Sequence, residues 1–452
     1  MTETKPKTIA IIGGYGGMGM LFARLFLDEG CSVIVTDPTE SKGLKAEKEL
    51  NVKYIKDNCE AAKASDVVIV TVPIDYTIKT IKEVAPCVKE GALLTDFTSV
   101  KEEPCRAMAE FSREGVEVIG MHPMFGPKTQ GLEGQVVVLT PVRPAYGASG
   151  DEYKWMPWLL SFLNKHDAKI IESTPEEHDK VISVVQGLTH FTYISVGKTL
   201  KDIDFDIKKS RKFASPIYEL MLDMIGRIIG QDPHLYASIQ MTNPRVLKVH
   251  EAFFRSAKEL SDAVKNKDHE KFVKYMSDAA KHFDDVDAAM GKSNKAVASL
   301  VAELHHLKES IGKEIALQHV YSKKIHLGIV ESVDSENVVL NDSGKQNVLK
   351  ISNIQILDDN ARIKFKTGKL GFVERDFSHV FESSVDEQFL CGLLEKFNEN
   401  IISAKIRDVY SGKSIPEGRK SICFRIGMIN ENLKETEKIV NRFLAGAGGK
   451  PR

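Results

Sequence analysis

Short apolar runs alternate with amphipathic segments over the first 173 residues. The apolar runs cover residues 8–12, 32–37, 66–73, 92–99, 116–123 and 135–141, with 168–174 as a candidate last strand. Continuous apolar runs of this length are typical of strands buried on both faces of a parallel sheet. Because helix-like segments separate most of the runs, the pattern predicts a doubly wound parallel α/β sheet over residues 1–173.

The pattern changes to helical periodicity at Thr174. Thr174, Pro175 and Glu177 form a capping box with proline at the first helical position. Helical patterns then follow at 175–200, 215–230, 244–266, 268–287 and 294–316. They predict an all-α domain over 174–318. A helical domain with few loops often buries its apolar faces against a second copy, so we expect a homodimer.

Short strands return near residue 323. The stretches 323–331, 337–340, 347–351 and 361–366 read as strands, with a hairpin turn at 341–344. A helix over 386–400, strands over 403–410 and 421–428, and a helix over 432–444 follow. This order predicts a small α+β domain over 319–452, in which a β-rich segment precedes a split βαβ unit.

Composition and charge place few restrictions on function. The chain has 452 residues, 42% hydrophobic and 28% charged, with a net charge of −1. Two to four domains fit this length. Because the net charge is close to zero, the overall electrostatics do not favour binding to nucleic acid or to a membrane. The start of the chain is polar, and no apolar run approaches the roughly 20 residues of a spanning helix.

The six cysteines are widely scattered and show neither a CxxC motif nor metal-like spacing. They are Cys31, Cys59, Cys87, Cys105, Cys391 and Cys423. We therefore expect free thiols, a cytoplasmic protein and no bound metal.

A glycine-rich loop follows the first apolar run. Gly14, Gly16 and Gly19 fit the GxGxxG pattern, and Asp37 comes 18 residues after Gly19, at the end of the next strand. Gly14 would permit the tight turn, Gly16 the close approach of a pyrophosphate, and Gly19 the packing of helix on strand. This context predicts a Rossmann dinucleotide-binding site rather than a glycine turn without a ligand.

The carboxylate of Asp37 would accept hydrogen bonds from ribose hydroxyls and repel a 2′-phosphate, which favours NAD over NADP. Lys42 lies close enough in sequence to tolerate a phosphate, so NADP stays open. The predicted cofactor-binding residues are Gly14, Tyr15, Gly16, Gly17, Met18, Gly19, Asp37, Thr71, Val72, Pro73 and Thr98.

His122 directly precedes Pro123 at the end of the fifth apolar run. The residue before a proline is held away from helical geometry. Ligands of open α/β sheets bind beyond the carboxyl ends of the strands, where Ser99 also lies. His122 could therefore take a proton from a substrate hydroxyl while hydride leaves the same carbon. The structural alternative is a histidine whose nitrogens are bonded to backbone.

Polar residues interrupt the apolar helices. Gln186 and His190 lie four residues apart, and either face a substrate pocket or are bonded at a dimer interface. Arg227 follows Glu219 and Asp223 at steps of four, so it either forms an ion pair on a solvated face or binds substrate.

The motifs GGYGGMG, TDFTSVK (95–101), GMHPMFGP (120–127), EEHDKVISVVQGLTHF (176–191) and FASPIYELMLDMIGRIIGQDPHLYASI (213–239) resemble prephenate dehydrogenases in order and spacing. The resemblance covers roughly residues 8–290. The form QGLTHF is similar to the branch of this family that is fused to chorismate mutase in some bacteria, although no mutase domain is evident here.

This resemblance implies a Rossmann domain, a helical dimerisation domain and NAD-dependent oxidative decarboxylation of prephenate to 4-hydroxyphenylpyruvate, an enzymatic step of tyrosine biosynthesis. It implies that His122 is the base for the ring hydroxyl and that Ser99 holds the imidazole and that hydroxyl in register. Arg227 would pair with a substrate carboxylate, and Gln186 and His190 would line the pocket.

The segment 406–428, IRDVYSGKSIPEGRKSICFRIGM, resembles the ferredoxin-like anticodon-binding domain of the phenylalanyl-tRNA synthetase β subunit, over about residues 375–445. Lys405, Arg407, Lys413, Arg419, Lys420 and Arg425 form a modest basic group. RNA binding is one interpretation. Because the charge of the domain is nearly balanced, we favour a solvated sheet face on a domain used for dimerisation or for sensing an aromatic amino acid.

Three rival functions stay open. Arogenate dehydrogenase would share the mechanism, since arogenate carries an amine where prephenate has a keto group. A different β-hydroxyacid-type dehydrogenase would usually need a lysine in the helical domain, and none stands out. A non-catalytic NAD-binding regulator would have no use for the set Ser99, His122 and Arg227.

Overall fold

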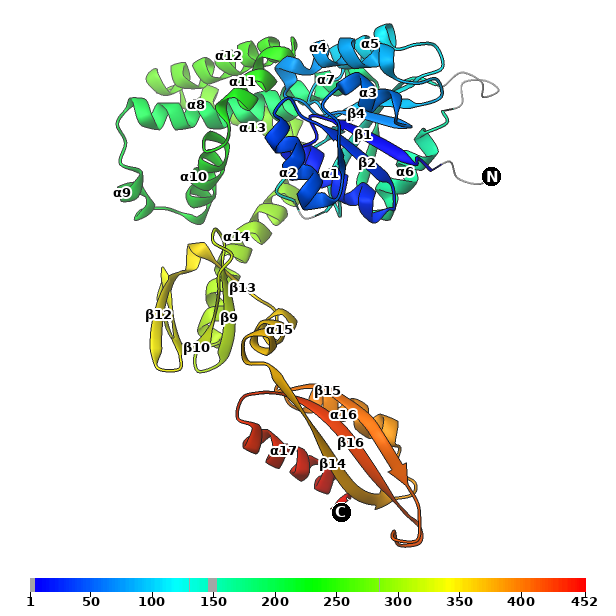
Figure 1. The fold of residues 1–452 in the computed structure, drawn as a ribbon. Helices are drawn as coiled ribbons and strands as arrows, with labels where there is room; N and C mark the ends of the chain where they lie inside the picture. Colours follow the sequence, from blue (N-terminus) through cyan, green and yellow to red (C-terminus); the bar gives the residue numbers. More distant parts are fainter. Residues whose placement is uncertain (1–4, 130, 145–152, 284) are drawn as a thin grey trace. The chain divides into compact units, whose positions relative to one another are not determined.

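The computed structural model describes residues 5–129, 131–144, 153–283 and 285–452. The polar first residues, 1–4, lie outside this part. The chain divides into two compact units, 1–284 and 285–452, which are described separately (Figure 1). The domain boundaries 1–173, 174–318 and 319–452 stay a prediction. In the part of the chain that the structure describes, no helix combines the length and apolar content needed to cross a bilayer.

An eight-stranded sheet forms the centre of the first unit, in the order β3-β2-β1-β4-β5-β6-β7-β8. The strands are β1 (Thr8–Ile12), β2 (Ser32–Thr36), β3 (Lys53–Tyr54), β4 (Val67–Val70), β5 (Leu93–Asp96), β6 (Glu117–Pro123), β7 (Val136–Arg143) and β8 (Lys169–Glu172). Strands β1 to β6 are parallel. The predicted α/β architecture is therefore confirmed.

One strand pairing differs from the all-parallel prediction. β7 is antiparallel to β6, and β8 is parallel to β7. A parallel neighbour needs a long crossover, usually a helix. The described residues between β6 and β7 form no helix, so the chain turns back directly and reverses the strand direction.

Helices cover both faces of this sheet (Figure 1). They are α1 (Gly17–Asp28), α2 (Glu40–Leu50), α3 (Asn58–Lys63), α4 (Ile74–Val84), the 3₁₀ turn η1 (Ala85–Cys87), α5 (Glu102–Phe111) and α6 (Met156–Lys165). Phe22 and Phe26 of α1 share one core cluster with Trp158 of α6. Ile81 of α4 and Met108 of α5 belong to a second core cluster. Two separate cores on one sheet are what a doubly wound fold requires.

The helical part comprises α7 (Pro175–Ile182), the π-helix η2 (Ser183–Leu188), α8 (Thr189–Asp202), α9 (Ile207–Arg211), α10 (Pro216–Ile229), α11 (Pro233–Thr242), α12 (Val246–Lys265) and α13 (His269–His282). The Thr174 hydroxyl accepts from the Glu177 amide, which confirms the predicted cap. The predicted helix 175–200 is helical throughout, but its middle part, η2, is π-helical rather than α-helical. The pattern had not predicted α11.

The second unit begins with α14 (Val286–Glu309) and a sheet in the order β12-β11-β10-β9-β13. Its strands are β9 (Glu314–His319), β10 (Ile325–Val333), β11 (Asn337–Asp342), β12 (Lys345–Lys350) and β13 (Ile354–Ile356). The hairpin at 341–344 is present, with positive φ angles at Ser343 and Gly344. The helix predicted over 294–316 ends at Glu309, because β9 pairs with β10 from Glu314 onward.

The strand predicted over 361–366 was wrong, because these residues lie within α15 (Asp359–Leu370). The alternation of apolar and basic residues suggested a strand. In the structure Asp358 caps the helix by accepting from the Ala361 amide. Arg362 and Lys366, four residues apart, then lie on one helix face, and both pair with Glu314. These distant ion pairs are not visible in a local pattern.

The last segment has the strand order and connections of a ferredoxin-like fold. It runs β14 (Phe372–Glu382), α16 (Glu387–Phe397), β15 (Ile401–Tyr410), β16 (Arg419–Ile429), α17 (Leu433–Gly446) and β17 (Lys450–Pro451), with the sheet order β15-β16-β14-β17. Ile422, Phe424 and Ile426 are fully buried, whereas Cys423 and Arg425 are partly exposed. The predicted inward and outward alternation of β16 is confirmed.

The prediction that all six cysteines are free thiols is wrong. Cys59 of α3 and Cys87 of η1 form a disulfide, with their Cα atoms 5.3 Å apart. The remaining four cysteines are unpaired. The two partners are separated by 28 residues and come together because α3 and α4 pack on the same face of the sheet, which spacing along the chain does not reveal.

Candidate active site

The glycine loop joins β1 to α1 and leaves the first amide groups of the helix open. Gly16 precedes the helix with an extended backbone and provides no side-chain cap. A Cβ at Gly19 would lie 2.6 Å from the carbonyl oxygen of Gly14, and a Cβ at Gly14 would lie 2.8 Å from Val35. Both glycines are thus required by close packing. The uncapped amides and the positive end of the helix dipole fit a pyrophosphate.

The tight turn itself is made at Gly13, which has a φ of +79°. The prediction that Gly14 makes this turn is wrong, because the φ of Gly14 is not positive. Glycine is the residue that adopts this conformation readily, and a side chain at position 13 would also collide with Val72 at 2.8 Å. Gly16 and Gly17 are exposed, whereas Tyr15 and Met18 are half-buried on the same loop.

Asp37 directly follows β2, beside the glycine loop. Its carboxylate accepts from the Thr39 amide at 2.8 Å, and its backbone carbonyl accepts from the Tyr54 hydroxyl at 3.2 Å. The carboxylate is therefore held at the carboxyl end of β2. Lys42 is exposed on α2. This geometry suits ribose recognition by a carboxylate with one free oxygen.

The segment after β4 closes the other side of the loop. The Thr71 hydroxyl donates to the carbonyl groups of Ile12 at 3.0 Å and Gly13 at 3.2 Å. Val72 contacts Gly13, and Pro73 stands immediately before α4. The structure thus brings the predicted residues Thr71 and Val72 against the glycine loop.

A buried ion pair, unanticipated in the sequence, lies beside Thr98. The Lys101 ammonium pairs with Asp96, and both side chains are completely buried. Thr98 bonds the same Asp96 carboxylate through its hydroxyl and its backbone amide. The hydroxyl of Thr98 is thus occupied within the protein. We expect any cofactor contact of Thr98 to use another atom.

His122 is the penultimate residue of β6, and its side chain is 3% exposed. Its Nδ1 lies 2.9 Å from Nε2 of His178 on α7. The other ring nitrogen, Nε2, lies 3.3 Å from the side-chain nitrogen of Gln186. His178 in turn bonds Asp179. The alternative of a histidine bonded to backbone is therefore not what the structure shows.

Burial lowers the pKa of His122 well below its usual value, and the charges of His178 and Lys101 lower it further. Burial also lowers the pKa of His178, although the bond to Asp179 opposes this effect. A histidine that is neutral at neutral pH can accept a proton, which is the state that a general base requires.

The hydroxyl of Ser99 is buried and has no hydrogen-bond partner among the described residues. We had expected it to hold the imidazole of His122, but the imidazole is bonded to His178 and Gln186 instead. Buried polar atoms without a partner are uncommon and point to a ligand or ordered water. The role of Ser99 toward a substrate stays a prediction.

Gln186 and His190 leave two more polar atoms without a partner, Oε1 of Gln186 and Nδ1 of His190. The His190 ring meets Tyr236 edge-on, with centroids 4.6 Å apart. Burial raises the pKa of Tyr236, and the nearby Arg227 guanidinium opposes this rise. Gln186 lies on the π-helical turn and reaches His122 from there. Tyr236 contacts His190 and is close enough to Arg227 to be affected by its charge.

Arg227 does not form the ion pair that its spacing suggested. Glu219 and Asp223 both pair with Arg211 of α9. Arg227 is exposed, and its side chain has no ion pair among the described residues. Its guanidinium is therefore available to a carboxylate.

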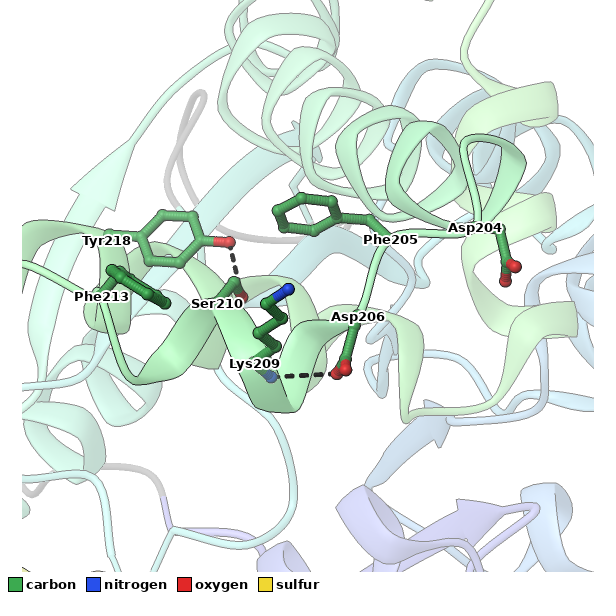
Figure 2. Close-up of a pocket in the computed structure, with 7 residues that line it drawn as sticks. All are labelled: Asp204, Phe205, Asp206, Lys209, Ser210, Phe213 and Tyr218. Carbon is green, nitrogen blue, oxygen red and sulfur yellow. Dashed lines mark hydrogen bonds between the residues drawn. The ribbon is translucent and has the colours of Figure 1, made fainter.

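An open groove lies elsewhere in the helical part, along residues 204–206, α9 and the start of α10. Figure 2 shows its lining residues, with Phe205 and Phe213 on either side of Lys209 and Ser210. It has a volume of about 620 Å³, and none of the predicted site residues lines it. Tyr218 donates to Ser210 at 3.0 Å. Over the described ranges no acidic, histidine and cysteine side chains cluster as metal ligands would.

The fold and this site define a nicotinamide-nucleotide-dependent dehydrogenase with a helical second domain. Family models for the nucleotide-binding domain and the dimerization domain of prephenate dehydrogenase match residues 22–172 and 174–278. A probable arogenate/prephenate dehydrogenase of Methanocaldococcus jannaschii is 46% identical over 448 residues, 98% of each chain. The chain therefore belongs to the prephenate dehydrogenase family.

One further relative and one solved structure are similar to this chain. A T-protein of Haemophilus influenzae is 33% identical over 67% of this chain and 73% of its own length. The crystal structure of prephenate dehydrogenase from A. aeolicus in complex with hydroxyphenyl propionate and NAD⁺ covers 64% of this chain and all of that one, with a TM-score of 0.52 and 21% identity. This structural likeness shows the shared fold.

Proposed function

We propose that the protein is an NAD-dependent prephenate dehydrogenase, which converts prephenate to 4-hydroxyphenylpyruvate and carbon dioxide. The observation that carries the proposal is the buried imidazole of His122, whose Nε2 lies 3.3 Å from the amide nitrogen of Gln186, a side chain whose Oε1 has no partner among the described residues. Such a constellation is suited to a substrate hydroxyl that must lose its proton.

The chain contributes the proton transfer and the positioning of substrate. Nε2 of His122 accepts the proton of the ring hydroxyl, and Ser99 and Gln186 hold that hydroxyl in place. Arg227 pairs with a substrate carboxylate. A nicotinamide cofactor, when bound along residues 13–19, supplies the hydride acceptor. Loss of carbon dioxide then leaves an aromatic ring, which makes the overall reaction effectively irreversible.

The test is NADH formation by the purified chain with prephenate and NAD, with arogenate and NADP as parallel alternatives. We expect turnover with prephenate and NAD. Absence of turnover with every pair, from folded protein that binds NAD, would contradict the proposal and favour a non-catalytic regulator.

Arogenate dehydrogenase is the second candidate, because the M. jannaschii relative carries both substrates in its name. The described residues that we place around the substrate (Ser99, Gln186, His190 and Arg227) include no carboxylate. An ammonium group would gain no ion pair from them, which favours the keto acid. Preference for arogenate in the same assay would reverse this assignment.

We expect Asp37 to set the preference for NAD. Asp37→Ser should lower the ratio of kcat/KM with NAD to kcat/KM with NADP by about 10–10²-fold, because a carboxylate facing a 2′-phosphate costs roughly 1–3 kcal/mol. Steady-state kinetics with both cofactors measure this ratio. Asp57→Ser removes a carboxylate that caps the neighbouring α3 and should leave the ratio unchanged. An unchanged ratio in Asp37→Ser would exclude the role.

We infer that the helical part forms a homodimer. Several large apolar side chains on its helices are exposed in the single chain, namely Val181, Val185, Phe213, Ile217, Met241 and Leu247. Exposed apolar area on this scale usually marks an interface. Sedimentation equilibrium of the full chain tests the expected dimer.

For the ferredoxin-like segment we propose a role in assembly or in sensing a small molecule rather than in RNA binding. Arg407 and Arg425 both pair with Asp376. Arg419 and Lys420 pair with Glu382 and Glu387. Much of the predicted basic group is therefore neutralised within the domain, which leaves little net positive charge for phosphates.

A further inference from the structure

The imidazole of His122 is the first member of a buried hydrogen-bonded chain that ends on a carboxylate. His122 Nδ1 and His178 Nε2 are 2.9 Å apart, and His178 Nδ1 and Asp179 Oδ1 are 2.7 Å apart. The two rings meet edge-on at 63°, and all three side chains are at most 3% exposed. Water therefore has little access to compete for these bonds.

The carboxylate at the end of the chain is fixed in orientation by backbone. Asp179 accepts from the amide of Lys101 at 2.7 Å and from the amide of Glu102 at 3.0 Å. These amides belong to the start of α5, where the helix dipole also favours a negative group. Asp179 thus serves as an acceptor toward α5 and toward His178.

These contacts determine which ring nitrogens carry protons. Because Asp179 accepts, Nδ1 of His178 must donate, which leaves Nε2 of His178 as an acceptor. His122 then donates from Nδ1, and its Nε2 keeps a lone pair. We propose that His178 and Asp179 are positioning residues that hold His122 in the tautomer whose Nε2 can take the substrate proton.

The same chain can accommodate the charge that forms during the reaction. When Nε2 of His122 accepts the substrate proton, the proton on Nδ1 can pass to Nε2 of His178, and the resulting imidazolium faces Asp179. The other groups around the pair are Gln186, which is neutral, and the buried ion pair of Lys101 with Asp96. The carboxylate of Asp179 is therefore the group placed to offset a positive charge on the two rings.

This inference rests on the proposed function for its kinetic consequences, but the tautomer can be measured without substrate. In ¹⁵N-histidine-labelled full-length protein, long-range ¹H–¹⁵N correlation spectra should show His122 protonated at Nδ1. Its signals are assigned by their absence in His122→Asn. In Asp179→Ala no acceptor faces Nδ1 of His178, so neither ring is fixed and the His122 proton should be shared between Nδ1 and Nε2.

Kinetics distinguish a tautomer effect from a merely structural one. Asp179→Ala should lower kcat by about 10²–10⁴-fold, because Nε2 of His122 is then protonated in part of the molecules and no carboxylate offsets the charge on the two rings. His178→Gln can still accept from His122 through Oε1 and donate to Asp179, so its loss should stay near tenfold, the cost of one imperfect hydrogen bond. The affinity for NAD should be unchanged in both variants.

The pH dependence of kcat/KM is an additional readout, because a packing defect would lower kcat/KM without shifting its acid limb. Removing the negative charge of Asp179 makes protonation of the two rings harder, so the acid limb in Asp179→Ala should move to lower pH by about one unit. Ser183→Ala is a matched control, since its buried hydroxyl bonds Lys180 on the same helical run and does not contact His122.

Three results would overturn the inference. They are a wild-type His122 protonated at Nε2, an Asp179→Ala variant with normal turnover, and equal losses in His178→Gln and Asp179→Ala. If the wild-type protein turns over neither prephenate nor arogenate but shows the expected tautomer, then the proposed function fails while the assignment of the proton positions stands.

Discussion

Replacing His122 by asparagine should lower kcat by about 10²–10⁴-fold, the usual contribution of a general base. Asparagine is close to the ring in size and can keep a bond toward His178, so the fold should be preserved. Its amide cannot accept a proton at a useful pH. Stopped-flow and steady-state measurement of NADH formation test the loss, and fluorescence titration tests NAD binding, which should be unchanged.

The wild-type pH profile belongs to the same expectation. Burial lowers the pKa of His122 well below 6.5, so the ring is neutral throughout the neutral range and becomes protonated only in acid. kcat/KM should therefore be independent of His122 protonation near pH 7 and fall at pH values well below 6.5. A His122→Asn variant with near-normal turnover, or an acid limb centred above 6.5, would contradict the assignment of the base.

The parts of the fold that depend on local patterns were predictable from the sequence. The apolar runs identify the strands of the first sheet, and the glycine spacing places the loop between β1 and α1. Thr174 with Glu177 marks the start of the helical part, and the turn at 341–344 connects two strands. In each case the determining residues lie within a few positions of one another, and their contacts are fixed by backbone geometry.

The parts that depend on distant contacts were not predictable in this way. β7 reverses because no helix crosses over, and α15 forms where its basic residues meet Glu314, about 50 positions earlier in the sequence. Cys59 meets Cys87 only because two helices share a face. A single sequence contains both residues of each contact, but it does not show that they are close in the fold.

The same distinction applies to the site. His122, Ser99 and the glycine loop could be proposed because they lie at strand ends. The bond between His122 and His178 joins positions 56 residues apart. A local signal for this bond, the adjacency of His178 and Asp179, was weak, because Glu176, Glu177 and Lys180 flank the pair in a largely charged helix. Lys101 gave no such signal, since lysines near helix starts are ordinarily solvated.

The second large effect is expected at Arg227. Arg227→Gln should raise the KM for prephenate by about 10–10²-fold, since a charge-assisted bidentate contact contributes roughly 1.5–3 kcal/mol. kcat should change little if the contact is equally strong in the ground state and in the transition state. The KM for NAD should be unchanged, because the cofactor-binding residues lie on the Rossmann sheet.

Arg211→Gln provides a matched control for this prediction. Arg211 is also an exposed arginine of the helical part, but its guanidinium is already paired with Glu219 and Asp223. Removing it should affect stability slightly and leave the KM for prephenate unchanged. Arg227 and Arg211 thus differ in whether the protein already supplies a carboxylate. An equal rise in KM for both variants would indicate a general electrostatic effect, whereas a rise confined to Arg227 identifies the free guanidinium as the carboxylate-binding group.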